Sequence, residues 1–123
     1  MPGKTVAQKL LIKDGYEVLV VDAPKGYIAA LKSDCPAADI AEKRKGEADL
    51  IQVFVSSSDD LKKKLPPLKD RLRPKGLLWL TYPKWTSDIN RDTIREYGGT
   101  IGLEAVAIIA VDDTWSALRL KVV

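Results

Sequence analysis

The fold is decided by residues 103–123, LEAVAIIAVDDTWSALRLKVV. This stretch holds two apolar segments, Leu103–Val111 and Leu118–Val123, joined by only about six residues. Two parallel strands need a crossover of a dozen residues or more, so the pair is predicted to form an antiparallel hairpin. The second segment alternates apolar and charged side chains, which indicates a strand with one exposed face beside the edge of a sheet.

Four further strands are predicted upstream of this hairpin. Glu17–Asp22, Leu50–Val55 and Leu77–Tyr82 are aliphatic without polar alternation, which is typical of parallel strands buried on both faces. Asp39–Glu42 forms a shorter strand. The sheet is therefore expected to be mainly parallel, with its antiparallel part at the C-terminal end of the sequence.

Helices are predicted between these strands. Thr5 and Gln8 have the spacing of a capping box that opens a short first helix, and Pro24 opens a second helix that runs to Lys32. Loop residues 33–38 then lead to the strand at Asp39. Strands that alternate with helices predict a single α/β domain over residues 1–123, with three layers.

Two helices are expected in the second half of the chain. Leucines at 61, 65, 68 and 72 line one helical face, and Ser56–Ser58 offer hydroxyls that cap its start. Pro66 and Pro67 predict that this helix is either two short helices or one sharply kinked helix, ending before Pro74. A last helix is capped by Asn90 or Asp88 and stopped by Gly98–Gly99.

Composition excludes several classes of chemistry. The chain has 123 residues, a formal charge of +3 and no histidine, so histidine-based triads, bases and metal ligands are excluded. Cys35 is the single cysteine and is expected to be an inert loop thiol without a disulfide. Uncharged runs reach only about seven residues, against about twenty for a membrane span, and the N-terminus lacks an apolar signal core. The expected location is the cytoplasm.

Charged and hydroxyl residues have ordinary structural interpretations. Within the basic stretch Lys43–Lys75, Lys62–Lys64 lie on the polar side of a leucine-faced helix with no aromatic residues interleaved, so they are expected on a solvated helix face and nucleic acid is not an expected partner. Ser56–Ser58 have no base to activate them and are interpreted as helix caps. Asp112 and Asp113 are adjacent on the chain and point apart, so no metal is expected.

The carboxyl edge of the sheet is the predicted ligand site, because ligands bind there in open α/β sheets. Aromatic and charged residues are expected to converge at this edge from the exits of three strands and the hairpin tip. The candidate pocket consists of Asp22, Tyr82, Lys84, Trp85, Asp113 and Trp115. The structural alternative is a hairpin turn in which Trp115 closes the core, Asp113 caps a backbone amide and Arg119 pairs with an aspartate.

Two stretches carry a resemblance to a known family. Residues 9–15, KLLIKDG, before Val18–Asp22, and residues 72–80, LRPKGLLWL, resemble the lead-ins to two strands of the class I S-adenosylmethionine-dependent methyltransferases. The resemblance implies a Rossmann-like, methyltransferase-like sandwich. Residues 82–84, YPK, and 113–119, DTWSALR, are similar to an uncharacterised family of small bacterial proteins.

One departure from the methyltransferase pattern shapes the functional hypotheses. That family binds its cofactor with a glycine-rich turn after the first strand, whereas this turn reads Asp22-Ala-Pro-Lys-Gly26. The leading hypothesis is a non-catalytic ligand-binding or regulatory domain that needs no cofactor. The rival hypothesis is a minimal methyltransferase in which Asp22, Gly26 and Glu42 bind S-adenosylmethionine. A third hypothesis is an interaction subunit that forms a homo-oligomer through an edge strand.

Overall fold

The computed structural model describes residues 5–42, 46–84 and 88–123, and its C-terminal hairpin is antiparallel as predicted. Strand β5 (Leu103–Ala110) pairs with β6 (Trp115–Val122), which in turn pairs antiparallel with β4 (Leu72–Pro83). Strand β5 forms the edge of the sheet and β6 lies beside it. The short connection therefore fixes the chain reversal, and the alternation in β6 correctly indicates its place next to the edge.

The remaining strands are parallel. They are β1 (Glu17–Val21), β2 (Asp39–Ala41) and β3 (Ala48–Phe54), and the six strands lie in the order β2-β1-β3-β4-β6-β5. Two strands begin earlier than predicted: β3 begins at Ala48 instead of Leu50, and β4 begins at Leu72 instead of Leu77. Residues 74–76, which the prediction left between a helix and a strand, lie inside β4 because β4 pairs with β3 both before them, at Leu72, and after them, from Leu77.

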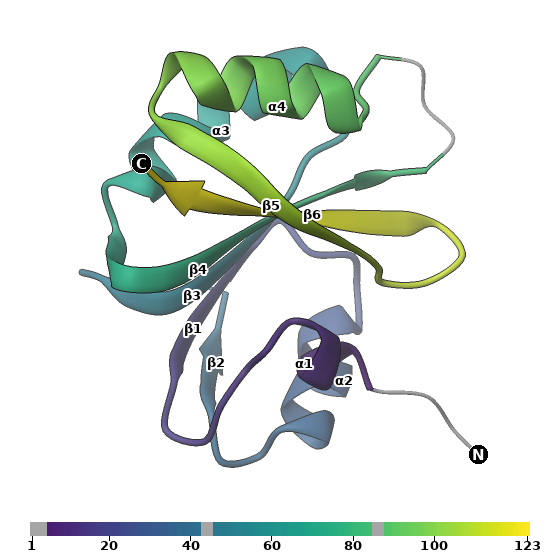
Figure 1. Ribbon diagram of the computed structural model, residues 1–123. Helices are drawn as coiled ribbons and strands as arrows, with labels where there is room; N and C mark the ends of the chain where they lie inside the picture. The colour runs from purple at the N-terminus through teal and green to yellow at the C-terminus, as the bar shows by residue number, and fades with distance from the viewer. Residues whose placement is uncertain (1–4, 43–45, 85–87) are drawn as a thin grey trace.

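Helices cover both faces of the sheet (Figure 1). Helices α3 (Ser58–Lys69) and α4 (Arg91–Thr100) lie on one face, and α1 (Val6–Lys9) and α2 (Tyr27–Asp34) lie on the other. Each face has its own core of buried apolar side chains. This is the predicted three-layer α/β sandwich, and no helix in the described ranges is long and apolar enough to cross a membrane.

Helix α3 corrects the prediction of a broken helix. It runs as one helix through Pro66 and Pro67 and ends at Lys69, before the predicted end. A proline removes the hydrogen bond to the carbonyl four residues earlier, here at Lys62 and Lys63, both of which are exposed to water. The Tyr97 hydroxyl also donates a long hydrogen bond of 3.5 Å to the Lys62 carbonyl. Burial of Leu61, Leu65 and Leu68 stabilises the uninterrupted helix.

The bounds of two other helices also differ from those predicted. Helix α2 begins at Tyr27, with Gly26 rather than Pro24 at its N-cap, and it extends to Asp34. Helix α4, capped by Asn90, continues through Gly98–Gly99 to Thr100. Gly98 is buried beside Leu103, and a Cβ atom there would lie 3.5 Å from Leu103, which is an ordinary contact, so the helix continues through both glycines despite their low helix propensity.

Candidate functional site

The tip of the β5–β6 hairpin lies at the carboxyl edge of the parallel strands, as predicted. Tyr82 pairs with Ser116 and Pro83 with Trp115, and the Lys84 amide donates a hydrogen bond of 2.8 Å to the Thr114 carbonyl. The Lys84 and Asp113 side chains are exposed there, while Tyr82 is only 6% exposed. Burial raises the pKa of the Tyr82 hydroxyl. Trp85 lies outside the described residues.

Trp115 packs against an aromatic cluster that the sequence did not predict. Its ring lies edge-on to Phe54 with centroids 5.0 Å apart, and Phe54 lies edge-on to Tyr27 at 4.9 Å. These contacts join the end of β3, the start of α2 and the start of β6. Edge-to-face pairs add about 0.5–1.5 kcal/mol beyond the burial of apolar area. Trp115 therefore closes the core while part of its ring remains accessible at the edge.

The hairpin turn is held by Asp112 rather than by Asp113. One oxygen of the Asp112 carboxylate accepts hydrogen bonds from the Thr114 and Trp115 amides, at 2.8 and 2.9 Å. This is the Asx turn that favours aspartate at such positions, one residue earlier than expected. Arg119 does not pair with an aspartate of the turn either. Its guanidinium instead lies over the ring of Trp79, 5.9 Å from the ring centroid.

Asp22, the residue after β1, forms an ion pair with Lys64, whose side chain was expected to lie in solvent. Lys64 of α3 places its ammonium 2.7 Å from the Asp22 carboxylate and 3.3 Å from that of Asp60. The same ammonium donates to the Phe54 carbonyl at 3.2 Å. The backbone of Asp22 is left-handed, with φ of 58°, and this strained conformation directs the carboxylate to α3. An ion pair therefore spans the exit of β1.

The pKa values of this cluster reflect the ion pairs. Burial alone would lower the pKa of Lys64, but the hydrogen bonds to Asp22 and Asp60 outweigh it and raise that pKa above its ordinary value. Burial would raise the pKa of Asp60, and hydrogen bonds from Ser56 and Lys64 outweigh it and lower that pKa. Both charged forms are therefore stabilised in the folded chain.

A buried polar chain lies beneath the aromatic cluster. The Tyr27 hydroxyl donates to the side-chain carbonyl of Gln52 at 2.7 Å, and the Gln52 amide donates to the Thr81 hydroxyl at 2.9 Å. Gln52 and Thr81 are fully buried in β3 and β4. Burial raises the pKa of Tyr27 well above its ordinary value, so the hydroxyl remains protonated. These polar groups satisfy one another, which connects α2 to the centre of the sheet.

The other residues of the cofactor hypothesis lie on the same side of the molecule. Gly26, with φ of 86°, precedes α2, and Glu42 follows the end of β2 and is exposed. Strand β2 pairs with β1, so Glu42 and Asp22 follow neighbouring parallel strands. The described residues thus bring Asp22, Gly26 and Glu42 to one edge, with the Asp22 carboxylate already paired to Lys64.

The cavity near this edge is small. A cavity of about 200 Å³ lies between α1, α2 and the start of the hairpin. Its lining residues are Val6, Tyr27, Ala30, Leu31, Asp34, Val111 and Asp112. Ligand sites for drug-sized molecules usually measure about 300–1,000 Å³. None of the five predicted pocket residues that the structure describes lines this cavity.

Other predicted sites have structural roles. The Ser57 hydroxyl accepts the Asp60 amide at the start of α3, which supports the prediction of a helix cap for this serine. The Ser58 hydroxyl instead donates to the Asp88 carbonyl, 30 residues along the chain. Cys35 is buried just after α2. Within the described part of the chain, no group of three or more metal-ligating side chains comes together.

Comparisons with known proteins agree on the fold. No family model and no curated protein sequence matches the chain, but 176 solved chains resemble it. An S-adenosylmethionine (SAM)-dependent methyltransferase from Clostridium acetobutylicum matches this chain with a TM-score of 0.64 and 10% sequence identity. That match covers 94% of this chain and 87% of the other.

Two more solved structures illustrate the range of the matches. Mitomycin 7-O-methyltransferase MmcR has a TM-score of 0.66 and 10% identity over 96% of this chain, which spans only 53% of that enzyme. A DhpI–SAM–HEP complex has a TM-score of 0.59 and 9% identity, covering 94% of this chain and 84% of the other. At such identities the likeness shows the fold alone. The chain therefore has a Rossmann-like fold related to the class I methyltransferases.

Proposed function

We propose that this chain is a non-catalytic small-ligand-binding domain on a methyltransferase-like fold. The observation that carries the proposal is the ion pair between Asp22 and Lys64, which occupies the exit of β1 with groups of the chain itself. In the family that shares this fold, glycines keep the corresponding turn open to the cofactor. Here Pro24 and a paired carboxylate take that place, and no histidine is present to act as a base.

The proposed ligand site is the remaining exposed part of the carboxyl edge. Lys84 and Asp113 supply opposite charges on either side of the Lys84–Thr114 hydrogen bond, and the accessible part of Trp115 supplies an apolar surface. Of the other predicted pocket residues, Tyr82 is buried behind this surface and Asp22 is paired with Lys64 at the exit of β1. A small planar molecule with polar substituents fits such a surface, because the ring stacks while the charges orient it.

Isothermal titration calorimetry tests this proposal with adenosine, S-adenosylhomocysteine and SAM as probes. We expect at least one probe to release heat with the wild-type protein, and Trp115→Ala to weaken that binding at least tenfold. Tyr16→Ala is the matched control, because Tyr16 is a partly exposed aromatic residue before β1, at the opposite edge. Absence of heat with all three probes, or an equal loss in the control, would refute the site.

A minimal methyltransferase is the second candidate, because its fold matches SAM-dependent enzymes and Asp22 and Glu42 follow neighbouring strands. Methyl transfer can proceed by proximity without a side-chain base. On this hypothesis SAM binds with a Kd below about 100 μM, or about 5–6 kcal/mol. Glu42→Gln should then weaken SAM binding while Glu96→Gln, on the exposed surface of α4, should leave it unchanged.

A third candidate is an interaction subunit that pairs two copies through β5. In the described residues β5 is hydrogen-bonded only to β6, and its Val106 and Ile108 side chains are 42% and 47% exposed. An apolar edge strand is a template for pairing with another strand, and a second copy of β5 is complementary to it. Light scattering should show a mass that rises with concentration, and Ile108→Lys should hold the mass at that of one chain. A constant mass would exclude this candidate.

A further inference from the structure

Strand β4 contains a bulge at the amino edge of the sheet, opposite the site described above. Between the pairs Ala48–Leu72 and Leu50–Leu77, β3 advances by two residues and β4 by five, so three residues are extra. Lys75 within the bulge has a left-handed backbone with φ of 65°. Such a conformation in a residue with a side chain costs roughly 1–3 kcal/mol and persists only where the surroundings enforce it.

The backbone is closely packed at Gly76, the residue after Lys75. A Cβ atom at Gly76 would lie 2.8 Å from the carbonyl oxygens of both Arg73 and Asp49. The guanidinium of Arg73 also bonds the Glu17 and Asp49 carboxylates at 2.9 Å each, which fixes the start of the bulge against β1 and β3. The Lys75 side chain is thereby held outside the strand ladder.

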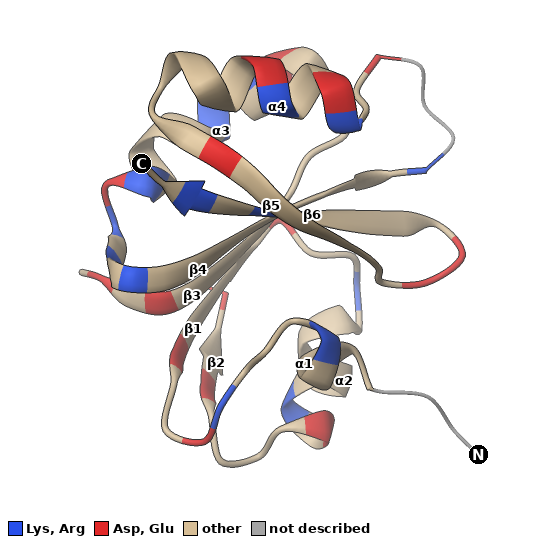
Figure 2. Ribbon diagram, viewed as in Figure 1, with Lys and Arg blue, Asp and Glu red and all other residues tan. Residues whose placement is uncertain are grey.

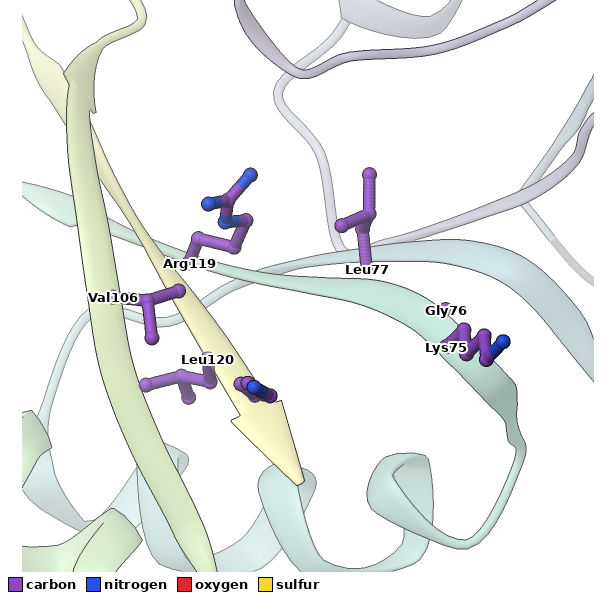
Figure 3. A pocket seen from close by; sticks show the side chains of 7 residues that line it. Lys75, Gly76, Leu77, Val106, Arg119 and Leu120 are labelled. Atoms are coloured by element: carbon purple, nitrogen blue, oxygen red, sulfur yellow. The ribbon is translucent and has the colours of Figure 1, made fainter. Parts of the chain in front are cut away.

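Two neighbouring cavities border the bulge and share Lys75, Gly76 and Lys121. The larger, of about 500 Å³, is rimmed by Lys69, Arg73, Lys75 and Lys121 against the single carboxylate of Glu47. The smaller, of about 320 Å³, adds an apolar surface from Leu77, Val106 and Leu120. Figure 3 shows Leu77 and Arg119 projecting on the same side of neighbouring strands, with Val106 next to Arg119. Both volumes lie in the range of small-molecule sites.

The two cavities are together called the amino-edge groove below, and their positive charge is only partly neutralised by other groups of the chain. Arg73 is paired with two carboxylates, Lys69 donates to the Ile101 carbonyl and Arg119 lies over the Trp79 ring. Among the described residues, the ammonium groups of Lys75 and Lys121 form no hydrogen bond or ion pair, although Glu104 faces Lys121 across the strands. Figure 2 shows basic residues where β4 begins and β6 ends, whereas the hairpin tip is acidic.

From this arrangement we infer that the two adjoining cavities at the amino edge bind a phosphate-bearing small molecule with an apolar or planar moiety, its phosphate in the larger cavity with Lys69 and its uncharged part in the smaller cavity with Leu77 and Val106, across the shared Lys75 and Lys121. The ammonium groups of Lys69, Lys75 and Lys121 are point charges that suit phosphate oxygens without demanding a fixed geometry. The surface of Leu77 and Val106 receives the uncharged moiety. This site is separate from the one in the proposed function.

Calorimetry at low salt tests the inference with ADP, pyrophosphate and adenosine. We expect ADP to bind more tightly than pyrophosphate, and the double variant Lys75→Gln/Lys121→Gln to weaken both at least tenfold. The control is Lys32→Gln/Lys63→Gln, which removes two exposed ammonium groups from α2 and α3 and should change binding less than twofold. Val106→Ala should weaken ADP more than pyrophosphate, because it removes apolar surface without adding a charge.

Several outcomes would overturn the inference. They are absence of heat with ADP and pyrophosphate, an equal loss in the control double variant, and ADP binding no tighter than pyrophosphate. A single-stranded oligonucleotide that binds more tightly than ADP, with a loss in the control variant, would assign the basic groups to nucleic acid instead. Trp115→Ala leaves ADP binding unchanged if the amino-edge groove is the site, so failure here is distinguishable from failure at the carboxyl edge.

Discussion

The two edges of the sheet are built from the same strands but end differently. At the carboxyl edge, turns bind their own polar groups: Asp112 holds the hairpin tip, and Lys64 joins Asp22 to Asp60. At the amino edge, the bulge in β4 separates the strands and leaves Lys75 and Lys121 beside cavities of about 320 and 500 Å³. The carboxyl edge, where the fold predicts ligands, thus has less free space than the amino edge. A shared fold therefore indicates the position of a ligand site only where the local turns leave room for a ligand.

The largest expected effect comes from Gly76→Ala, which breaks the amino edge. The new Cβ would approach two backbone carbonyls to 2.8 Å, so the bulge must shift. We expect a loss of about 3 kcal/mol in the free energy of unfolding, or failure to fold, measured by urea denaturation. Gly99→Ala is the control, because that position is helical and open, and it should stabilise the chain by roughly 0.5–1 kcal/mol. Equal effects of the two variants would show that the bulge is not constrained.

Next in size is Thr81→Val, which tests the polar chain beneath the carboxyl edge. The substitution keeps the shape but leaves the buried Gln52 amide without its acceptor, so we expect about 2 kcal/mol of destabilisation. Thr100→Val removes an exposed hydroxyl and should change stability by less than about 0.5 kcal/mol. A neutral Thr81→Val would mean that the polar chain does not stiffen this half of the sheet.

Much of the fold, but less of the site, could be predicted from sequence. Apolar runs and connection lengths predicted the strands, the sandwich and the antiparallel hairpin, because burial and loop length are local properties. The continuous helix through Pro66 and the early start of β4 depend on packing against other elements, which local propensity does not register. Register between strands is likewise non-local, so the bulge at Lys75 was not predicted.

The candidate site illustrates the same limit. The convergence of Tyr82, Lys84 and Trp115 followed from strand direction, and the register confirms it. The pairing of Lys64 with Asp22 could not be predicted, because it depends on the left-handed backbone of Asp22 and on the rotation of α3. One signal was available: Asp60 and Lys64 have the four-residue spacing of a helical ion pair, although Asp59 and Lys63 have the same spacing, so the sequence does not single out Lys64.

An alkaline titration sharpens the description of the carboxyl edge. The pKa of Tyr27 is raised above 10.0 in the folded chain, so its contribution to stability is complete below pH 10 and is lost as the pH rises through the folded-state pKa. Tyr27→Phe should cost about 1 kcal/mol at pH 7 and should reduce the loss of stability above pH 10. The measurement is urea unfolding from pH 7 to 11. Tyr82 has a pKa raised in the same direction, so Tyr82→Phe should remove a further part of the loss of stability above pH 10.

The smallest stability change is expected for Lys64→Gln, which opens the exit of β1. The group is partly exposed, so we expect at most about 1 kcal/mol of destabilisation near pH 7. The raised pKa of Lys64 makes this contribution disappear as the pH rises above about 10.5, and the lowered pKa of Asp60 makes it disappear as the pH falls below about 3.8. Wild-type and variant stabilities should therefore converge at both extremes, with Lys63→Gln as the control that leaves the whole profile unchanged.

The same variant separates the two edges by binding. Removal of Lys64 frees the Asp22 carboxylate, so S-adenosylhomocysteine should bind more tightly by calorimetry if the ion pair is what closes the carboxyl edge. ADP at the amino edge should bind as in the wild type, because its lining residues do not include Lys64. An unchanged affinity for S-adenosylhomocysteine would show that Pro24 and the aromatic cluster close the edge without the lysine, and a parallel change in ADP binding would show that the two edges are coupled.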